Sequence, residues 1–187
     1  MAVGTREALV RAAEGLMRTK GYAAFSYADL AETVGIKKAS IHHHFPTKED
    51  LGVAIVEAYV AKVRGEFERI EREHADAVRR LEAFFSVFRA SSEGGLLPLC
   101  GALAAEMTVL PSGLQKLTQL FFDMQLTWLT KVLDGGVKAG EIQAGPGTRQ
   151  KAFQLLSLLE GASFISWAMR DGETLDRSII RLIIEEA

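Results

Sequence analysis

The chain has 187 residues, enough to bury a substantial apolar core in one domain or two. Its first residues lack the basic flank and apolar stretch of a secretory signal, and no run of about 18 uncharged apolar residues indicates a membrane span. The net charge of −2 excludes a protein whose whole surface coats nucleic acid, so any such contact has to be a local patch. The single cysteine, Cys100, cannot form an internal disulfide, which suits a reducing compartment. We therefore expect a cytoplasmic protein that does not contact a membrane.

Apolar residues recur every three or four positions along almost the whole chain, and no sustained alternation marks a strand. This pattern predicts an all-α fold. The first helix is expected over residues 5–20 and ends at Gly21. A capping-box-like start at Ser26 predicts a short second helix over residues 27–34, and a third short helix is expected over residues 38–45, before Pro46.

Beyond residue 47 the expected helices are longer and their apolar faces are wider. Six are predicted: about 25 residues from residue 47, then segments around 78–88, 98–110, 112–140, 148–170 and 179–184. The sequence therefore predicts nine helices in two domains. A three-helix domain covers residues 1–47, and a larger helical domain covers residues 48–187.

The segment from residue 26 to residue 50 has the organisation of a helix-turn-helix, with two short helices joined by a turn that contains Gly35. In the third helix, Ile41 and Phe45 lie four residues apart and are expected to pack on the first two helices. Small and polar side chains then occupy the opposite face and its N-terminal end, where recognition helices point into a DNA groove: Lys37, Lys38, Ala39, Ser40, His42 and His43.

Two strings in this segment resemble the DNA-binding signature of the tetracycline-repressor (TetR) family. They are GIKKASIHHHFPTKEDL, residues 35–51, and FSYADLA, residues 25–31. The expected helix number and lengths are also similar to that family's nine-helix plan. The resemblance implies a dimeric, ligand-responsive transcriptional regulator, in most cases a repressor released from its operator by a small molecule.

The resemblance also implies DNA-contacting roles for matching positions. Lys38, Ala39, His42 and His43 correspond to groove-facing positions. Phosphate contacts are implied for His44, Lys48 and Ser26, and Tyr27 completes the expected set. Many relatives carry tyrosine where this chain has His42 and often His43. An imidazole is shorter than a phenol and its charge depends on pH, so the phosphate contacts at these positions differ from the family pattern.

An effector site is expected among the apolar residues of the larger domain. The predicted contacts are Phe84, Phe88, Cys100, Leu103, Met107, Phe121, Met124, Gln125, Trp128, Phe164 and Trp167. Glu106, Gln125 and Glu160 stand among apolar neighbours and are candidates for orienting the ligand. Cys100 has two interpretations, a small buried apolar residue or a sensor thiol activated by a helix N-terminus.

A dimer contact is expected on the helix over residues 148–170, which is apolar nearly all round. Ser157, Gly161 and Ile165 fall four residues apart and leave room for the close approach of a partner helix. The predicted interface is a symmetric four-helix contact, and the family resemblance implies the same pairing. Its residues are Ser157, Glu160, Gly161, Phe164, Ile180 and Ile183.

Other classes of function find less support in the sequence. No phosphate-binding glycine loop, metal-ligand spacing or nucleophile elbow is present, so we expect no catalytic residue, no metal and no cofactor. Consecutive histidines on a helix diverge by about 100° each and cannot converge on one ion. A protein-binding scaffold would have no use for the basic face from Lys37 to Lys48. The expected partners are double-stranded operator DNA, a small-molecule effector and a second copy of the chain.

Overall fold

The computed structural model describes residues 4–91, 95–143, 145, 147–170 and 175–185, and within these ranges it contains nine helices and no strand. The all-α prediction is therefore confirmed. The chain divides into two compact units. The first comprises Met1–Ala61 with Leu99–Phe121, and the second comprises Lys62–Pro98 with Phe122–Ala187.

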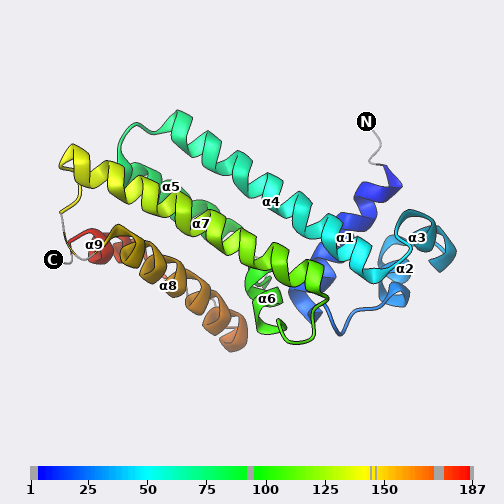
Figure 1. The fold of residues 1–187 in the computed structure, drawn as a ribbon. Coiled ribbons are helices and arrows are strands. Elements are labelled where there is room, and N and C mark those ends of the chain that lie inside the picture. Colours follow the sequence, from blue (N-terminus) through cyan, green and yellow to red (C-terminus); the bar gives the residue numbers. More distant parts are fainter. Residues whose placement is uncertain (1–3, 92–94, 144, 146, 171–174, 186–187) are drawn as a thin grey trace. The chain divides into compact units, whose positions relative to one another are not determined.

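The first unit contains the N-terminal helices, one later helix in full and parts of two others (Figure 1). These are α1 (Thr5–Lys20), α2 (Tyr27–Val34), α3 (Lys38–His44), the first half of α4 (Lys48–Glu73), α6 (Leu99–Ala105) and the start of α7 (Ser112–Ala139). Helix α1 packs against both α2 and α6. The core includes Leu9, Leu30, Ile41 and Leu103, each at most 1% exposed. Residues far apart in sequence thus share one core with the helix-turn-helix.

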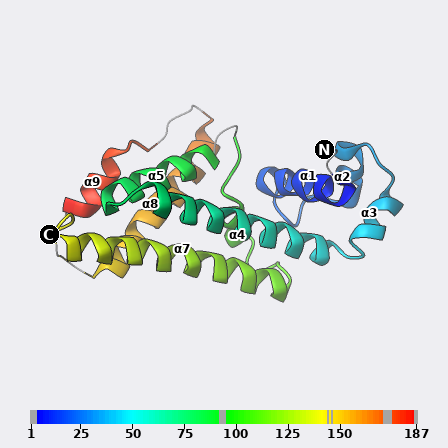
Figure 2. The same cartoon turned by 90° about the horizontal axis from the view of Figure 1, so that it is seen from above.

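The second unit contains the rest of α4 and α7 together with α5 (Ala77–Ser91), α8 (Thr148–Met169) and α9 (Ser178–Glu185). Helix α9 packs against α5 and α8, and α5 and α9 are seen side by side in Figure 2. The core of the second unit holds a group of aromatic rings. The Phe67 and Trp128 rings are stacked with centroids 4.4 Å apart, and the Phe84 ring lies 5.7 Å from Trp128. Contacts between aromatic rings stabilise a core beyond the apolar area that they bury.

Most predicted helix bounds agree with the structure, but α6 ends five residues earlier than expected. It ends at Ala105, and residues 106–110 form turns. The amides of Glu106 and Met107 donate to carbonyls only three residues back, at Leu103 and Ala104, which tightens the chain out of α-helical geometry. Pro111 follows, and the residue before a proline is disfavoured in helical conformation.

Helix α8 exposes several large apolar side chains. Phe153 is 54% exposed, Ile165 63% and Met169 60%. By length and composition α8 is also the one helix in the described ranges that could cross a membrane. One such helix does not by itself indicate a membrane protein, because core helices of soluble proteins share these properties. The exposed apolar face does indicate a surface that a partner would cover.

Candidate nucleic-acid interface and effector region

The third helix presents the face that the sequence predicts for DNA contact. Ile41 is fully buried and Phe45 is 2% exposed, so they fix α3 on its neighbours. The predicted contacts on the other side are all exposed, except for the half-buried His44: Lys37, Lys38, Ala39, Ser40, His42 and His43. Lys37 precedes the first turn of α3 with an extended backbone. The arrangement offers two cations and short polar groups to a nucleic acid.

The start of α2 is held by a complete capping box. The Ser26 hydroxyl accepts from the amides of Ala28 and Asp29, and the Asp29 carboxylate accepts from the Ser26 amide at 2.7 Å. Lys20 donates to the same carboxylate at 2.8 Å, and these hydrogen bonds, led by that of Lys20, hold the pKa of Asp29 well below its usual range. Ser26 is exposed, but its hydroxyl also donates to the Asp29 carboxylate at 2.6 Å, so the predicted phosphate contact would have to replace this hydrogen bond.

Tyr27 ties the two helices of the motif together. Its hydroxyl lies 2.6 Å from the carbonyl oxygen of Thr47 and 3.0 Å from that of Phe45. Burial, with smaller contributions from Asp50 and Tyr22, raises the pKa of Tyr27 to about 12, so the phenol stays neutral and donates. The ring also contacts His42 edge-on at 4.9 Å. Tyr27 therefore sets the position of α3 relative to α2, in addition to its predicted contact with DNA.

Lys48 has intramolecular partners that the sequence did not indicate. Its ammonium group donates to the carbonyl oxygen of Phe25 at 2.5 Å and lies 4.4 Å from the centre of the Phe25 ring and 4.7 Å from that of Tyr22. Burial lowers its pKa, against the opposing effect of Glu106 and Asp29. This placement gives Lys48 a structural role in the turn before α2, beside its predicted phosphate contact.

The predicted effector contacts are divided between the two compact units. Cys100, Leu103, Met107 and Phe121 belong to the first unit, and the others belong to the second. Cys100 is fully buried, which favours the packing interpretation over the sensor thiol. In the second unit, Phe84 and Phe88 lie 6.2 Å apart and join the Trp128 cluster. Met107, Met124 and Phe164 are half-buried, and Trp167 is 40% exposed.

Gln125 is the predicted effector contact with the clearest chemical signal. It is 3% exposed, and its Nε2 has no hydrogen-bond partner among the described residues. An unpaired buried donor costs about 1–3 kcal/mol, and native proteins contain few of them. It lies on α7 one turn before Trp128. A ligand with a hydrogen-bond acceptor would satisfy this amide.

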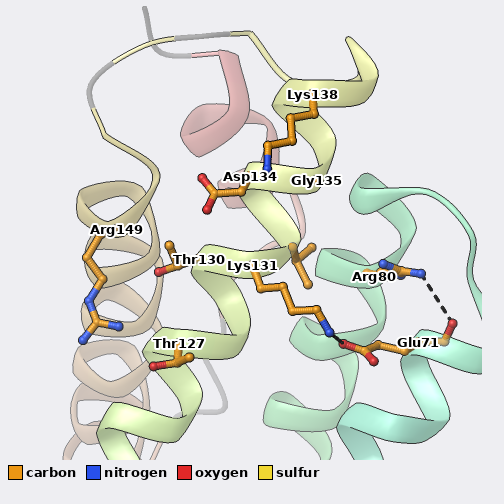
Figure 3. Close-up of a pocket in the computed structure, with 10 residues that line it drawn as sticks. Glu71, Arg80, Thr127, Thr130, Lys131, Asp134, Gly135, Lys138 and Arg149 are labelled. Carbon is orange, nitrogen blue, oxygen red and sulfur yellow. Dashed lines mark hydrogen bonds and ion pairs between the residues drawn. The ribbon is translucent and has the colours of Figure 1, made fainter.

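A groove of about 670 Å³ lies along α7 in the second unit, but its walls are charged (Figure 3). Lys131 pairs with the Glu71 carboxylate at 3.0 Å, and the Arg80 guanidinium donates to the His74 carbonyl at 2.9 Å. None of the predicted effector contacts lines it. Most of its charged groups are already paired, and Val132 is the one apolar side chain among its lining residues, so we regard it as a solvated surface groove.

Glu106 makes contacts that the sequence did not indicate. Predicted to orient a ligand, it belongs to the first unit, where its carboxylate accepts from the amides of Tyr22 at 2.7 Å and Ala23 at 3.2 Å. Sequence spacing could not reveal this contact, because 84 residues separate the partners.

The predicted dimer residues fall into two groups. Ser157 and Gly161 are exposed on α8, whereas Glu160 and Phe164 are half-buried. Ile180 is only 2% exposed and packs in the core of the second unit. Its side chain has little surface left for a partner, whereas Leu182, another apolar residue of α9, is 56% exposed. The side chain of Ile183 lies outside the described part of the chain.

Comparison with known proteins agrees with this organisation. Residues 9–55 match the family described as "Bacterial regulatory proteins, tetR family", and residues 77–182 match "Tetracyclin repressor-like, C-terminal domain". The chain belongs to the TetR family. TetR-family proteins are transcriptional regulators with a helix-turn-helix, not enzymes, and they bind DNA and small-molecule ligands, typically as dimers.

Individual TetR-family relatives share moderate identity with the chain. The regulator CymR of Pseudomonas putida is 43% identical over 56 residues, 30% of this chain and 28% of that protein. The nucleoid occlusion factor SlmA of Marinobacter nauticus is 29% identical over 164 residues, 86% of this chain and 77% of that protein. A TetR transcriptional regulator from Legionella pneumophila has a similar structure, with a TM-score of 0.84 at 28% identity over 98% of this chain and 95% of that chain.

Proposed function

We propose that this TetR-family regulator is a cytoplasmic repressor that binds a palindromic operator as a homodimer and is released by a small apolar or electrophilic effector. Residues 1–47 read the DNA, and residues 48–187 bind the effector and form the dimer. The observation that carries the proposal is the α3 face, where buried Ile41 and Phe45 fix the helix and leave Lys37, Lys38 and Ala39 exposed.

The dimer is supported by the apolar stripe on α8. Phe153, Ser157, Gly161 and Ile165 follow one another at four-residue spacing and are all exposed. The small residues at its centre allow two helices to approach closely. A two-fold dimer brings two copies of α3 to DNA, which requires half-sites one or more helical turns apart, about 34 Å or a multiple of it.

The effector class is supported by the second unit. The aromatic cluster around Trp128 suits an apolar body, and the buried Gln125 amide suits one hydrogen-bond acceptor such as a carbonyl oxygen. An electrophile would also have to reach Cys100, whose thiol is buried.

Selection of duplexes from a random library by the full-length chain tests the DNA-binding proposal. We expect enrichment of a palindrome and an affinity that falls steeply with salt. Joint replacement of Lys37 and Lys38 by Glu should abolish binding, whereas Lys62→Glu, an exposed lysine on α4, serves as the control. A library without an enriched sequence, or binding that salt does not weaken, would contradict the proposal.

A further inference from the structure

The turn between α1 and α2 is held by two charged side chains of opposite sign. The Glu106 carboxylate accepts hydrogen bonds from two amides of the turn, those of Tyr22 and Ala23. The Lys48 ammonium group donates to a carbonyl oxygen of the turn, that of Phe25. Hydrogen bonds to ionised groups are shorter and stronger than neutral ones. The turn therefore depends on residues that come from α4 and from the end of α6.

This turn positions Ser26, which is predicted to contact phosphate. Lys20, directly before it, forms an ion pair with Asp29 at 2.8 Å, and Asp29 accepts from both the amide and the hydroxyl of Ser26. A shift of the turn would displace Lys20 and Ser26, which flank it in the chain. The N-terminus of α2 would move with them.

The approach of Glu106 to the turn is built into the backbone. Gly21 has a φ of +87°, which glycine adopts without strain, and a Cβ atom there would collide with the Glu106 carboxylate. At the other end, the Glu106 amide donates to the Leu103 carbonyl oxygen at 3.0 Å. Leu103 is a predicted effector contact on α6. One side chain and one backbone hydrogen bond thus connect α6 to the turn, all within the first compact unit.

We propose that Glu106 is the positioning residue through which α6 controls DNA binding. With α6 in the observed position, the carboxylate holds the α1–α2 turn, and with it Ser26, in place for a phosphate. Displacement of α6 withdraws the carboxylate from the Tyr22 and Ala23 amides and releases the start of α2. This role rests on the proposed function and specifies its regulation.

Hydrogen exchange and operator affinity test the contact together. Glu106→Ala should speed exchange at the Tyr22 and Ala23 amides at least tenfold and weaken binding to the selected duplex about ten- to hundredfold. Glu106→Gln should fall between Ala and wild type, because its amide oxygen can still accept. Glu141 offers a matched control, since its carboxylate accepts from the Ala77 amide at 2.7 Å in the other unit. Glu141→Ala should change exchange at Ala77 and leave operator affinity unchanged.

A double-mutant cycle separates control by α6 from a purely structural role. Leu103→Val leaves a small cavity in α6 and should weaken operator binding in the wild-type background. In the Glu106→Ala background the same change should have much less effect, because the connection to the turn is already lost. Additive effects would overturn the proposal, as would faster exchange in Glu106→Ala with unchanged operator affinity. If the wild-type chain selects no duplex, both the proposed function and the positioning role of Glu106 are refuted. Hydrogen exchange at Tyr22 and Ala23 would still report whether the Glu106 carboxylate contacts the two amides.

Discussion

Replacing Glu160 by Gln should remove a pH dependence from the stability of the protein. Glu160 on α8 is half-buried as a residue, but both of its carboxylate oxygens are buried, and neither has a hydrogen-bond partner among the described residues. Burial raises its pKa from 4.5 to about 7. In the unfolded chain the group ionises at its ordinary pKa, so the folded state holds the extra proton between these two values.

The sign and size of the effect follow from proton linkage. Because the folded-state pKa lies above the unfolded one, stability is full below pH 4.5 and is lost as pH rises through about 7. Each unit of pKa corresponds to about 1.4 kcal/mol, so the loss over the interval from 4.5 to about 7 is at most about 3.5 kcal/mol. A neutral glutamine avoids the cost of burying a charge at high pH.

Urea denaturation between pH 5 and pH 8 measures this difference. The protein concentration has to be fixed, because the proposed dimerisation would be linked to folding. The unfolding free energy of the wild type should fall with pH by up to about 3 kcal/mol relative to Glu160→Gln. Glu57→Gln, at an exposed position on α4, should follow the wild type. Equal pH profiles for wild type and Glu160→Gln would refute the reasoning.

Three further predictions follow from the placement of single residues. Lys48→Met should lower the unfolding free energy by about 1–3 kcal/mol, because the Phe25 carbonyl loses its donor. Lys37→Met, at an exposed position, should leave stability unchanged and reduce the salt slope of DNA binding by about one. Unchanged stability of Lys48→Met in urea would contradict the first part. Gly161→Leu should yield monomers in sedimentation, and Gly135→Leu should not, although a side chain at either position meets open space within the chain; a dimeric Gly161→Leu would remove α8 from the interface. Cys100 should react with a thiol reagent far more slowly in native protein than in urea, and equal rates would show an accessible thiol.

The sequence predicted the local structure well because local signals determine it. Helix α2 begins at the Ser26 capping box and ends at Gly35, which has a φ of +73°, as expected. The spacing of Ile41 and Phe45 predicted the buried side of α3. These features depend on residues within about four positions of one another. Periodicity alone was sufficient to find the long helices.

Contacts between distant segments could not be predicted in this way. Helical spacing marked Ile180 as apolar but could not distinguish the core of its own unit from a dimer surface. Glu106 stood out as a polar residue among apolar ones, yet its partners lie 84 and 83 residues earlier in the chain. Lys48 was assigned from a resemblance, which indicates where relatives contact DNA but not which carbonyl groups surround the ammonium here. The sequence boundary at residue 47 marks the end of the motif, whereas the compact unit that contains the motif also includes Leu99–Phe121.

The segments that make up the first unit indicate how an effector bound elsewhere would act on the DNA-binding helices. Helix α4 passes without interruption from the first unit into the second, and its 26 residues span about 39 Å at 1.5 Å each. A tilt of about 5° would therefore displace one end by about 3 Å relative to the other. The end in the first unit begins with Lys48, which holds the carbonyl side of the α1–α2 turn, and Glu106 holds its amide side. A tilt of α4 and a shift of α6 would thus act on the same turn. If both movements occur, their effects on operator affinity should not be independent. Each movement removes the hydrogen bonds on one side of the turn, and both sides are needed to keep Ser26 in position.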